Sequence, residues 1–93
     1  MYSKHFLLLV CEASTDESRL GITVTTKIDK RAVVRNRIKR RIREIFRLNR
    51  HRLKKEIDVV VVARRDSGVI EFADFEREIL GALFNKGYLI RAE

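Results

Sequence analysis

The chain has 93 residues, of which 45% are apolar and 37% are charged, with one Cys and no Pro. This length suits one small domain spanning 1–93, and the apolar share is typical of a globular chain rather than a disordered one. A single Cys excludes an internal disulfide and a Cys-based zinc site, and no apolar run approaches the length of a membrane span. We therefore expect a cytoplasmic domain without membrane contact.

Two strands are expected at the start of the chain. Residues 4–13 form a continuous apolar run, which favours a strand that is buried on both faces or central in its sheet. Cys11 within this run is interpreted as a small buried hydrophobe. After a polar turn at 14–18, residues 19–26 alternate apolar Leu20, Ile22 and Val24 with small or polar residues. A strand, a short turn and a second strand predict an antiparallel hairpin.

The next stretch, 27–55, carries most of the positive charge. It holds 14 of the 21 Lys and Arg residues and only two acids, whereas the rest of the chain has 7 basic and 11 acidic residues. Its apolar residues recur at helical spacing without an interrupting Gly or Pro, at Val34, Ile38, Ile42 and Ile45. A helix is predicted from about Arg31 to Asn49 or a little beyond. Asp29 either caps this helix or lies one turn too early, and the sequence leaves both possibilities open.

The predicted helix has a cationic side opposite its apolar stripe. Like charges three or four residues apart repel, so a polyanion that neutralises them would remove this repulsion and stabilise the helix. Nucleic-acid phosphate is such a polyanion, because each neutralised phosphate releases condensed counterions. Solvated charged faces usually mix Glu with Lys, and this face has a single Glu. The composition therefore favours nucleic-acid binding over a bare solvated face or a membrane-surface helix.

The second half of the chain predicts one strand and one helix. Residues 56–64 are rich in β-branched residues, as buried strands are. Arg64 and Arg65 follow in a turn, where RNA contact and a salt bridge to Asp66 remain open alternatives. A second helix is expected at 71–86, with an apolar stripe toward the sheet and Gly87 as its stop signal. Residues 88–91 are expected to form a short strand or a tail.

This order of elements, β-β-α-β-α, predicts an α+β sandwich. Both helices are expected to pack against a sheet of three or four strands. Ordinary handedness statistics would predict a right-handed connection between parallel strands. Neither a catalytic triad nor a Gly-rich phosphate loop is evident, and no cluster of carboxylates lies near the basic helix. Metal-ligating Cys and His residues at suitable spacing are also missing, so no metal site made by the protein alone is expected.

The order of residues in the basic stretch resembles a known family. Residues 32–44 read AVVRNRIKRRIRE, which resembles the RNR signature of the bacterial ribonuclease P protein family. RLGITV at 19–24 and DVVVVAR at 58–64 are similar to the strands that flank this helix in the family. The resemblance covers about residues 4–88. Lys30 stands where family members often carry Gly, and the family's first helix, which bears aromatic residues, has no counterpart ahead of the strand at 4–13.

The resemblance implies a fold and a function. The implied fold is that of ribonuclease P proteins, related to domain 2 of ribosomal protein S5, with an unusual left-handed β-α-β crossover through the basic helix. The implied function is that of an accessory subunit of ribonuclease P, an endoribonuclease that removes the 5′ leader of precursor tRNA. In this enzyme an RNA holds the active site with Mg²⁺, so the protein would carry no catalytic residue. The implied partners are that RNA and precursor tRNA, and no obligate protein partner is evident.

The candidate site residues follow from the matched motif. Contact with the catalytic RNA is expected from basic and amide side chains of the helix and its lead-in: Lys27, Lys30, Arg31, Arg35, Asn36, Arg37, Lys39, Arg40, Arg43 and Arg47. Arg35 and Arg37 flank the polar face, so one of them could instead bond to the domain itself. Lys4 and Phe6 on the first strand are the candidates for contact with the single-stranded leader.

Two other functions are compatible with a basic helix on a small domain. A non-enzymatic protein that binds ribosomal RNA, in the ribosome or during its assembly, would use the same phosphate chemistry. A DNA-binding module would place the basic helix in the major groove. Cleavage of precursor tRNA by a reconstituted complex distinguishes both from a ribonuclease P subunit.

Overall fold

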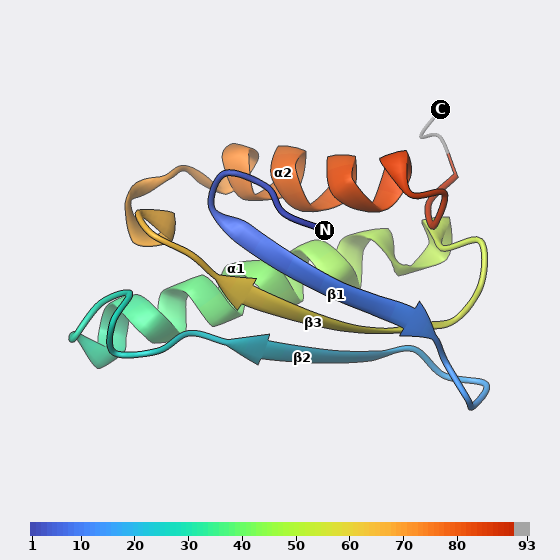
Figure 1. Cartoon of the computed structure of the whole chain (residues 1–93), viewed down its shortest axis with the longest axis horizontal. Helices are drawn as coiled ribbons and strands as arrows, with labels where there is room; N and C mark the ends of the chain where they lie inside the picture. The colour runs from blue at the N-terminus through green and yellow to red at the C-terminus, as the bar shows by residue number, and fades with distance from the viewer. Residues whose placement is uncertain (91–93) are drawn as a thin grey trace.

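The computed structural model describes residues 1–90, which form a three-stranded sheet covered on one face by two helices (Figure 1). The elements are β1 (Phe6–Glu12), β2 (Arg19–Thr23), α1 (Ala32–Asn49), β3 (Ile57–Ala63) and α2 (Phe72–Asn85). Two short 3₁₀ turns, η1 (Arg50–Arg52) and η2 (Ser67–Val69), follow α1 and β3. The predicted order of elements is confirmed, and each predicted boundary lies within a few residues of the observed one.

The sheet order is β1-β3-β2, with β3 in the centre. β1 pairs antiparallel with β3, from Phe6 opposite Ala63 to Glu12 opposite Ile57. β2 pairs with β3 in parallel, from Arg19 opposite Asp58 to Thr23 opposite Val62. The predicted β1–β2 hairpin is therefore wrong. The short turn after β1 connects the two edge strands of the sheet, and β3 lies between them.

The crossover from β2 through α1 to β3 joins parallel neighbours. In Figure 1, β2 and β3 both point to the left, β3 lies above β2, and α1 returns behind the sheet. This path turns in the left-handed sense, as the family resemblance implies and against the usual preference.

The hydrophobic core lies between the helices and one face of the sheet. Alternate residues of β1 and β3 point into it and are buried: Phe6, Leu8, Ile57, Val59, Val61 and Ala63. The helices contribute four buried residues of α1 and three of α2, and Val24 and Leu89 lie in the same core: Val34, Ile38, Ile42, Ile45, Phe75, Ile79 and Leu83 are the helical residues. Because strand side chains alternate between faces, the other residues of the same strands point to an uncovered face.

The uncovered face corrects two expectations for the first strand. β1 is an edge strand, so it is neither central nor buried on both faces, and Leu9 is 54% exposed. Cys11 is exposed as well, and its interpretation as a buried hydrophobe is wrong. The long apolar run of β1 therefore reflects one buried face and one apolar face without a helix over it. β3, not β1, is the strand with neighbours on both sides.

Candidate nucleic-acid interface

The helix α1 is held by its apolar stripe rather than by its ends. Its N-cap residue, Arg31, has extended backbone and no capping side-chain bond, and its first turn contains no acid. Asp29 lies too early to cap the helix; its Oδ1 accepts from the Arg31 backbone N–H at 2.8 Å. Val34, Ile38, Ile42 and Ile45 are buried at helical spacing. Burial of this stripe against the sheet therefore supplies the stability that capping does not.

The opposite side of α1 forms a cationic ridge, a name used here for Asn36, Lys39, Arg40, Arg43 and Arg47. All are exposed except Lys39, which is half-buried. Within residues 1–90, no carboxylate lies within ion-pair distance of Lys39, Arg40 or Arg43. Arg47 of the ridge pairs with an acid, Glu44, and the hydrogen bonds from Arg47 hold the pKa of Glu44 below its ordinary value. The ridge thus presents largely uncompensated positive charge to solvent.

The lead-in to the helix is partly tied to the domain. Lys27 and Lys30 are exposed, and Arg31 pairs with Asp29. Hydrogen bonds from Arg31 lower the pKa of Asp29 to about 2, so this carboxylate stays charged at neutral pH. Arg35 donates to the backbone oxygens of Asp29 and Lys30, at 2.9 and 2.8 Å. Arg35 therefore braces the loop that enters the helix, while Lys27 and Lys30 stay available to a partner.

Two further arginines of α1 turn toward η2 and α2. Arg37 donates to the Gly68 oxygen at 3.3 Å, and its half-buried position takes it off the ridge. Arg41 donates to the Ile70 oxygen at 2.9 Å and lies over the Phe75 ring, 5.4 Å from its centroid. Both Arg35 and Arg37, the two flanking residues of the motif, are thus bonded to the domain itself. Arg41 is bonded to the domain in the same way.

The two candidates for leader contact lie in different environments. Lys4 is exposed ahead of β1. Phe6 is fully buried, with its ring centroid 5.0 Å from that of Phe75. Its ring cannot stack on a base, so the prediction for Phe6 is corrected: the residue belongs to the core. The pleat explains the difference, because Phe6 is the first residue of β1 that points toward the helices.

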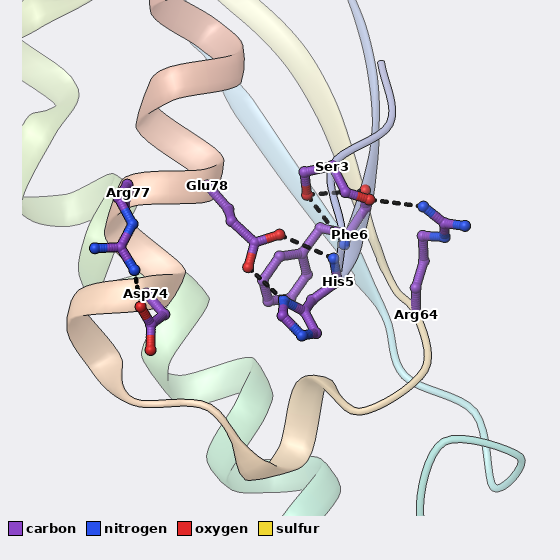
Figure 2. A network of polar contacts seen from close by, with 7 residues as sticks. All are labelled: Ser3, His5, Phe6, Arg64, Asp74, Arg77 and Glu78. Carbon is purple, nitrogen blue, oxygen red and sulfur yellow. Dashed lines mark hydrogen bonds and ion pairs between the residues drawn. The ribbon is translucent and has the colours of Figure 1, made fainter.

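An exposed aromatic that sequence reasoning missed lies beside Lys4. Tyr2 is 74% exposed, and the Arg64 guanidinium lies 4.9 Å from the centroid of its ring. Arg64 also donates to the Ser3 oxygen at 2.6 Å, as Figure 2 shows. Within residues 1–90, neither Arg64 nor Arg65 pairs with Asp66, so the predicted alternative of a salt bridge in this turn is not realised. The sequence carried a signal for this residue, because Tyr2 is an aromatic that stands close to Lys4 just ahead of the first strand.

A polar network fixes the chain ahead of β1 to α2 (Figure 2). Both oxygens of Glu78 accept from His5: Oε1 from the backbone N–H at 2.8 Å and Oε2 at 2.5 Å from ring Nδ1. Partial burial would raise the pKa of Glu78, but the hydrogen bonds from His5 outweigh it and the pKa is lowered. Because His5 is anchored inward, its neighbour Lys4 projects to solvent.

Comparison with known proteins agrees with this geometry. The sequence model of the family Ribonuclease P matches residues 1–87. The chain belongs to the ribonuclease P protein family. The ribonuclease P protein component of Syntrophus aciditrophicus is 49% identical over 85 residues, which cover 91% of this chain and 70% of that protein. That of Clostridium botulinum strain Langeland is 38% identical over 88 residues, covering 92% and 78%.

Solved structures of ribonuclease P proteins have the same fold. The Staphylococcus aureus protein superposes with a TM-score of 0.85 at 27% identity, covering 97% of this chain and 82% of that one. The Thermotoga maritima protein gives a TM-score of 0.81 at 31% identity, covering 99% and 83%. Proteins of this family are the protein subunit of ribonuclease P, the endoribonuclease of tRNA 5′ maturation, in which catalysis is carried by the RNA. The expected family and function are confirmed, and nothing found favours the ribosomal alternative.

No helix within residues 1–90 combines the length and the apolar character needed to cross a membrane. None of the comparisons tests the individual contact residues, which therefore stay predictions.

Proposed function

We propose that the chain docks on the catalytic RNA of ribonuclease P through the cationic ridge of α1. The observation that carries this proposal is the exposure of Arg40 and Arg43 without acidic partners in the described structure. Each guanidinium that meets a phosphate releases counterions, and its planar fork matches phosphate oxygens better than an ammonium group does. Asn36, Lys39 and Arg47 extend the same surface, with Lys27 and Lys30 at its N-terminal end.

Arg31, Arg35 and Arg37 have a second role in this proposal. Their guanidinium groups hold the lead-in loop and η2 against the helix, so they position the ridge and add long-range positive potential. The Arg31 side chain is exposed, so it is also accessible to a phosphate of the RNA.

We also infer that precursor tRNA contacts the end of the sheet where β1 begins. Lys4, Arg64 and Arg65 are exposed there, and the Tyr2 ring offers a surface on which a single-stranded base can stack. The 5′ leader is the part of precursor tRNA that suits such a surface, because its unpaired bases are free to splay onto aromatic rings.

Mg²⁺ belongs in this proposal to the RNA partner, where it supplies the chemistry of phosphodiester hydrolysis. The chain contributes by lowering the electrostatic repulsion between two RNA molecules. Since RNA processing of this kind takes place where tRNA is transcribed, a bacterial cytoplasmic location follows from the same proposal.

The docking surface is tested by the salt dependence of RNA affinity. In the variant Arg40→Ala/Arg43→Ala, the slope of log affinity against log salt should fall by about 0.7 to 0.9 for each lost phosphate contact. The matched control is Arg77→Ala, which removes an exposed arginine from α2 that pairs with Asp74. An unchanged slope in the double variant would remove Arg40 and Arg43 from the interface.

The role in processing is tested by reconstitution. The chain is mixed with a bacterial ribonuclease P RNA and precursor tRNA at low Mg²⁺, and 5′ cleavage is measured. Stimulation by the chain that is lost in the double variant supports the proposal. RNA binding without any stimulation would contradict it and favour a purely structural RNA-binding protein.

A further inference from the structure

A pocket of about 280 Å³ opens beside the cationic ridge. It lies between the C-terminal half of α1, the first residues of β2 and the first residues of β3. Its lining falls into two groups, an apolar floor and a basic rim. The floor consists of Leu20, Phe46, Leu53, Ile57 and Val59, and the rim contains Arg19, Arg43, Arg47 and Arg50, with Ser18 beside them.

The floor is an apolar surface that the fold leaves partly uncovered. Ile57 and Val59 belong to the buried core, whereas Leu20, Phe46 and Leu53 are only partly buried against it. β2 is a short edge strand of five residues, and within residues 1–90 no further strand pairs beyond it. The described residues therefore leave Phe46 and Leu20 open to an apolar or aromatic group from outside.

The rim carries more positive than negative charge. Arg19 pairs with Asp58, Arg47 with Glu44, and Arg50 lies 4.0 Å from Glu56. Arg43 has no such partner within residues 1–90, and it belongs both to the rim and to the ridge. A ligand that combines a flat apolar body with a neighbouring anionic group would satisfy both parts of the pocket.

We propose that this pocket receives a single unpaired nucleobase of the RNA that is bound on the ridge. The inference rests on the proposed function, and it adds the structural element of RNA that the chain recognises: a bulged or flipped-out nucleotide rather than a continuous duplex. A base is flat and apolar on its faces. Its phosphates are joined to it through the ribose, which brings them within reach of Arg43 when the base occupies the pocket. At about 280 Å³ the pocket lies at the lower end of the range of ligand pockets, about 300–1,000 Å³, and its size suits one ring system.

Position supports the choice of a base over other apolar groups. The ridge residues Arg43 and Arg47 both line the pocket and are both exposed, so an RNA backbone that follows the ridge passes its mouth. Stacking on an aromatic floor is tolerant of sequence, because every base has a π-face. The pocket would therefore recognise an unpaired position in the RNA without selecting one particular base.

The experiment compares two short hairpin RNAs that differ at one position. One carries a single bulged nucleotide, and the other carries an abasic residue at the same bulge, so both have the same number of phosphates. The chain of 93 residues should bind the bulged RNA about tenfold more tightly than the abasic RNA, since base–aromatic stacking is worth a factor of this order. Equal affinity for the two RNAs would overturn the pocket while leaving the docking role of the ridge intact.

Variants that fill the pocket test whether it causes the preference for the bulged RNA. Leu20→Phe and Leu53→Phe each add a ring to the floor from a different wall, and both should abolish the tenfold preference while affinity for the abasic RNA stays unchanged. The matched control is Leu48→Phe, which adds the same ring to α1 at a side chain that is 46% exposed and does not line the pocket. Thermal unfolding identifies the filling variant that keeps the fold, and that variant decides the test. A folded filling variant that keeps the preference for the bulged RNA would overturn the proposal. If the unaltered chain binds neither RNA, that result would instead refute the proposed function.

Discussion

The two helices of this protein perform the same structural task with opposite surfaces. Both lie on one face of the sheet, and each buries a stripe of large apolar residues against it (Figure 1). On the solvent side, α1 presents cations that mostly lack acidic partners within the described residues. In α2, by contrast, Asp74 pairs with Arg77 of the same helix and Glu78 pairs with His5, which lies ahead of β1. The comparison shows that the buried side of a helix places it in the fold, while its solvent side determines what it can bind.

Truncation of a buried side chain should destabilise the protein to a similar extent in either helix. Ile42 in α1 and Ile79 in α2 are both fully buried. Ile42→Ala and Ile79→Ala should each lower the free energy of unfolding by about 2–5 kcal/mol, because each removes buried methyl groups and leaves a cavity. Urea denaturation measures both values. A loss below about 1 kcal/mol in only one variant would break the equivalence of the two helices.

The helix ends should respond differently. α2 stops at Gly87, whose φ of +81° lies in the left-handed region that side chains disfavour, with its N–H bonded to the Phe84 oxygen at 3.0 Å. Gly87→Ala should cost about 1–2 kcal/mol from this backbone strain, since no atom lies within 4 Å of the added methyl group.

The control for that change is the second glycine of the same helix. Gly81 also has open space around it but lies in the helix interior, so Gly81→Ala should be neutral or stabilising by up to about 1 kcal/mol. α1 needs no such residue, because its chain continues directly into the 3₁₀ turn Arg50–Arg52. Equal stabilities for the two alanine variants would show that the left-handed turn does not determine the end of α2.

The smallest expected effect concerns the single acid within α1. Glu44 pairs with Arg47 and neutralises part of the ridge. Glu44→Gln should raise affinity for the catalytic RNA about two- to threefold, the scale of an exposed ion pair of under 1 kcal/mol. Glu76→Gln removes one charge from α2 and should leave the affinity unchanged. Fluorescence anisotropy at fixed salt measures both, and equal gains would mean that only the net charge of the chain matters.

Much of the candidate site could be predicted from local sequence. Helical spacing of Val34, Ile38, Ile42 and Ile45 identified the inner side of α1, and the residues opposite them could then be placed on the surface without any knowledge of the sheet. The same reasoning could not place Arg35, Arg37 and Arg41, because their partners are the Lys30, Gly68 and Ile70 oxygens. Two of these three carbonyls come from η2 and its flank, about thirty residues further along the chain.

The sequence alone determined the types and limits of the elements, the concentration of charge on one helix and the family to which the chain belongs, because these depend on neighbouring residues and on their order. Only the tertiary structure decided that β3 separates β1 from β2, that Phe6 is buried while Cys11 is exposed, and that a pocket opens beside the ridge. Strand pairing joins residues far apart in the chain, and alternation along a strand does not say which of its faces the helices will cover.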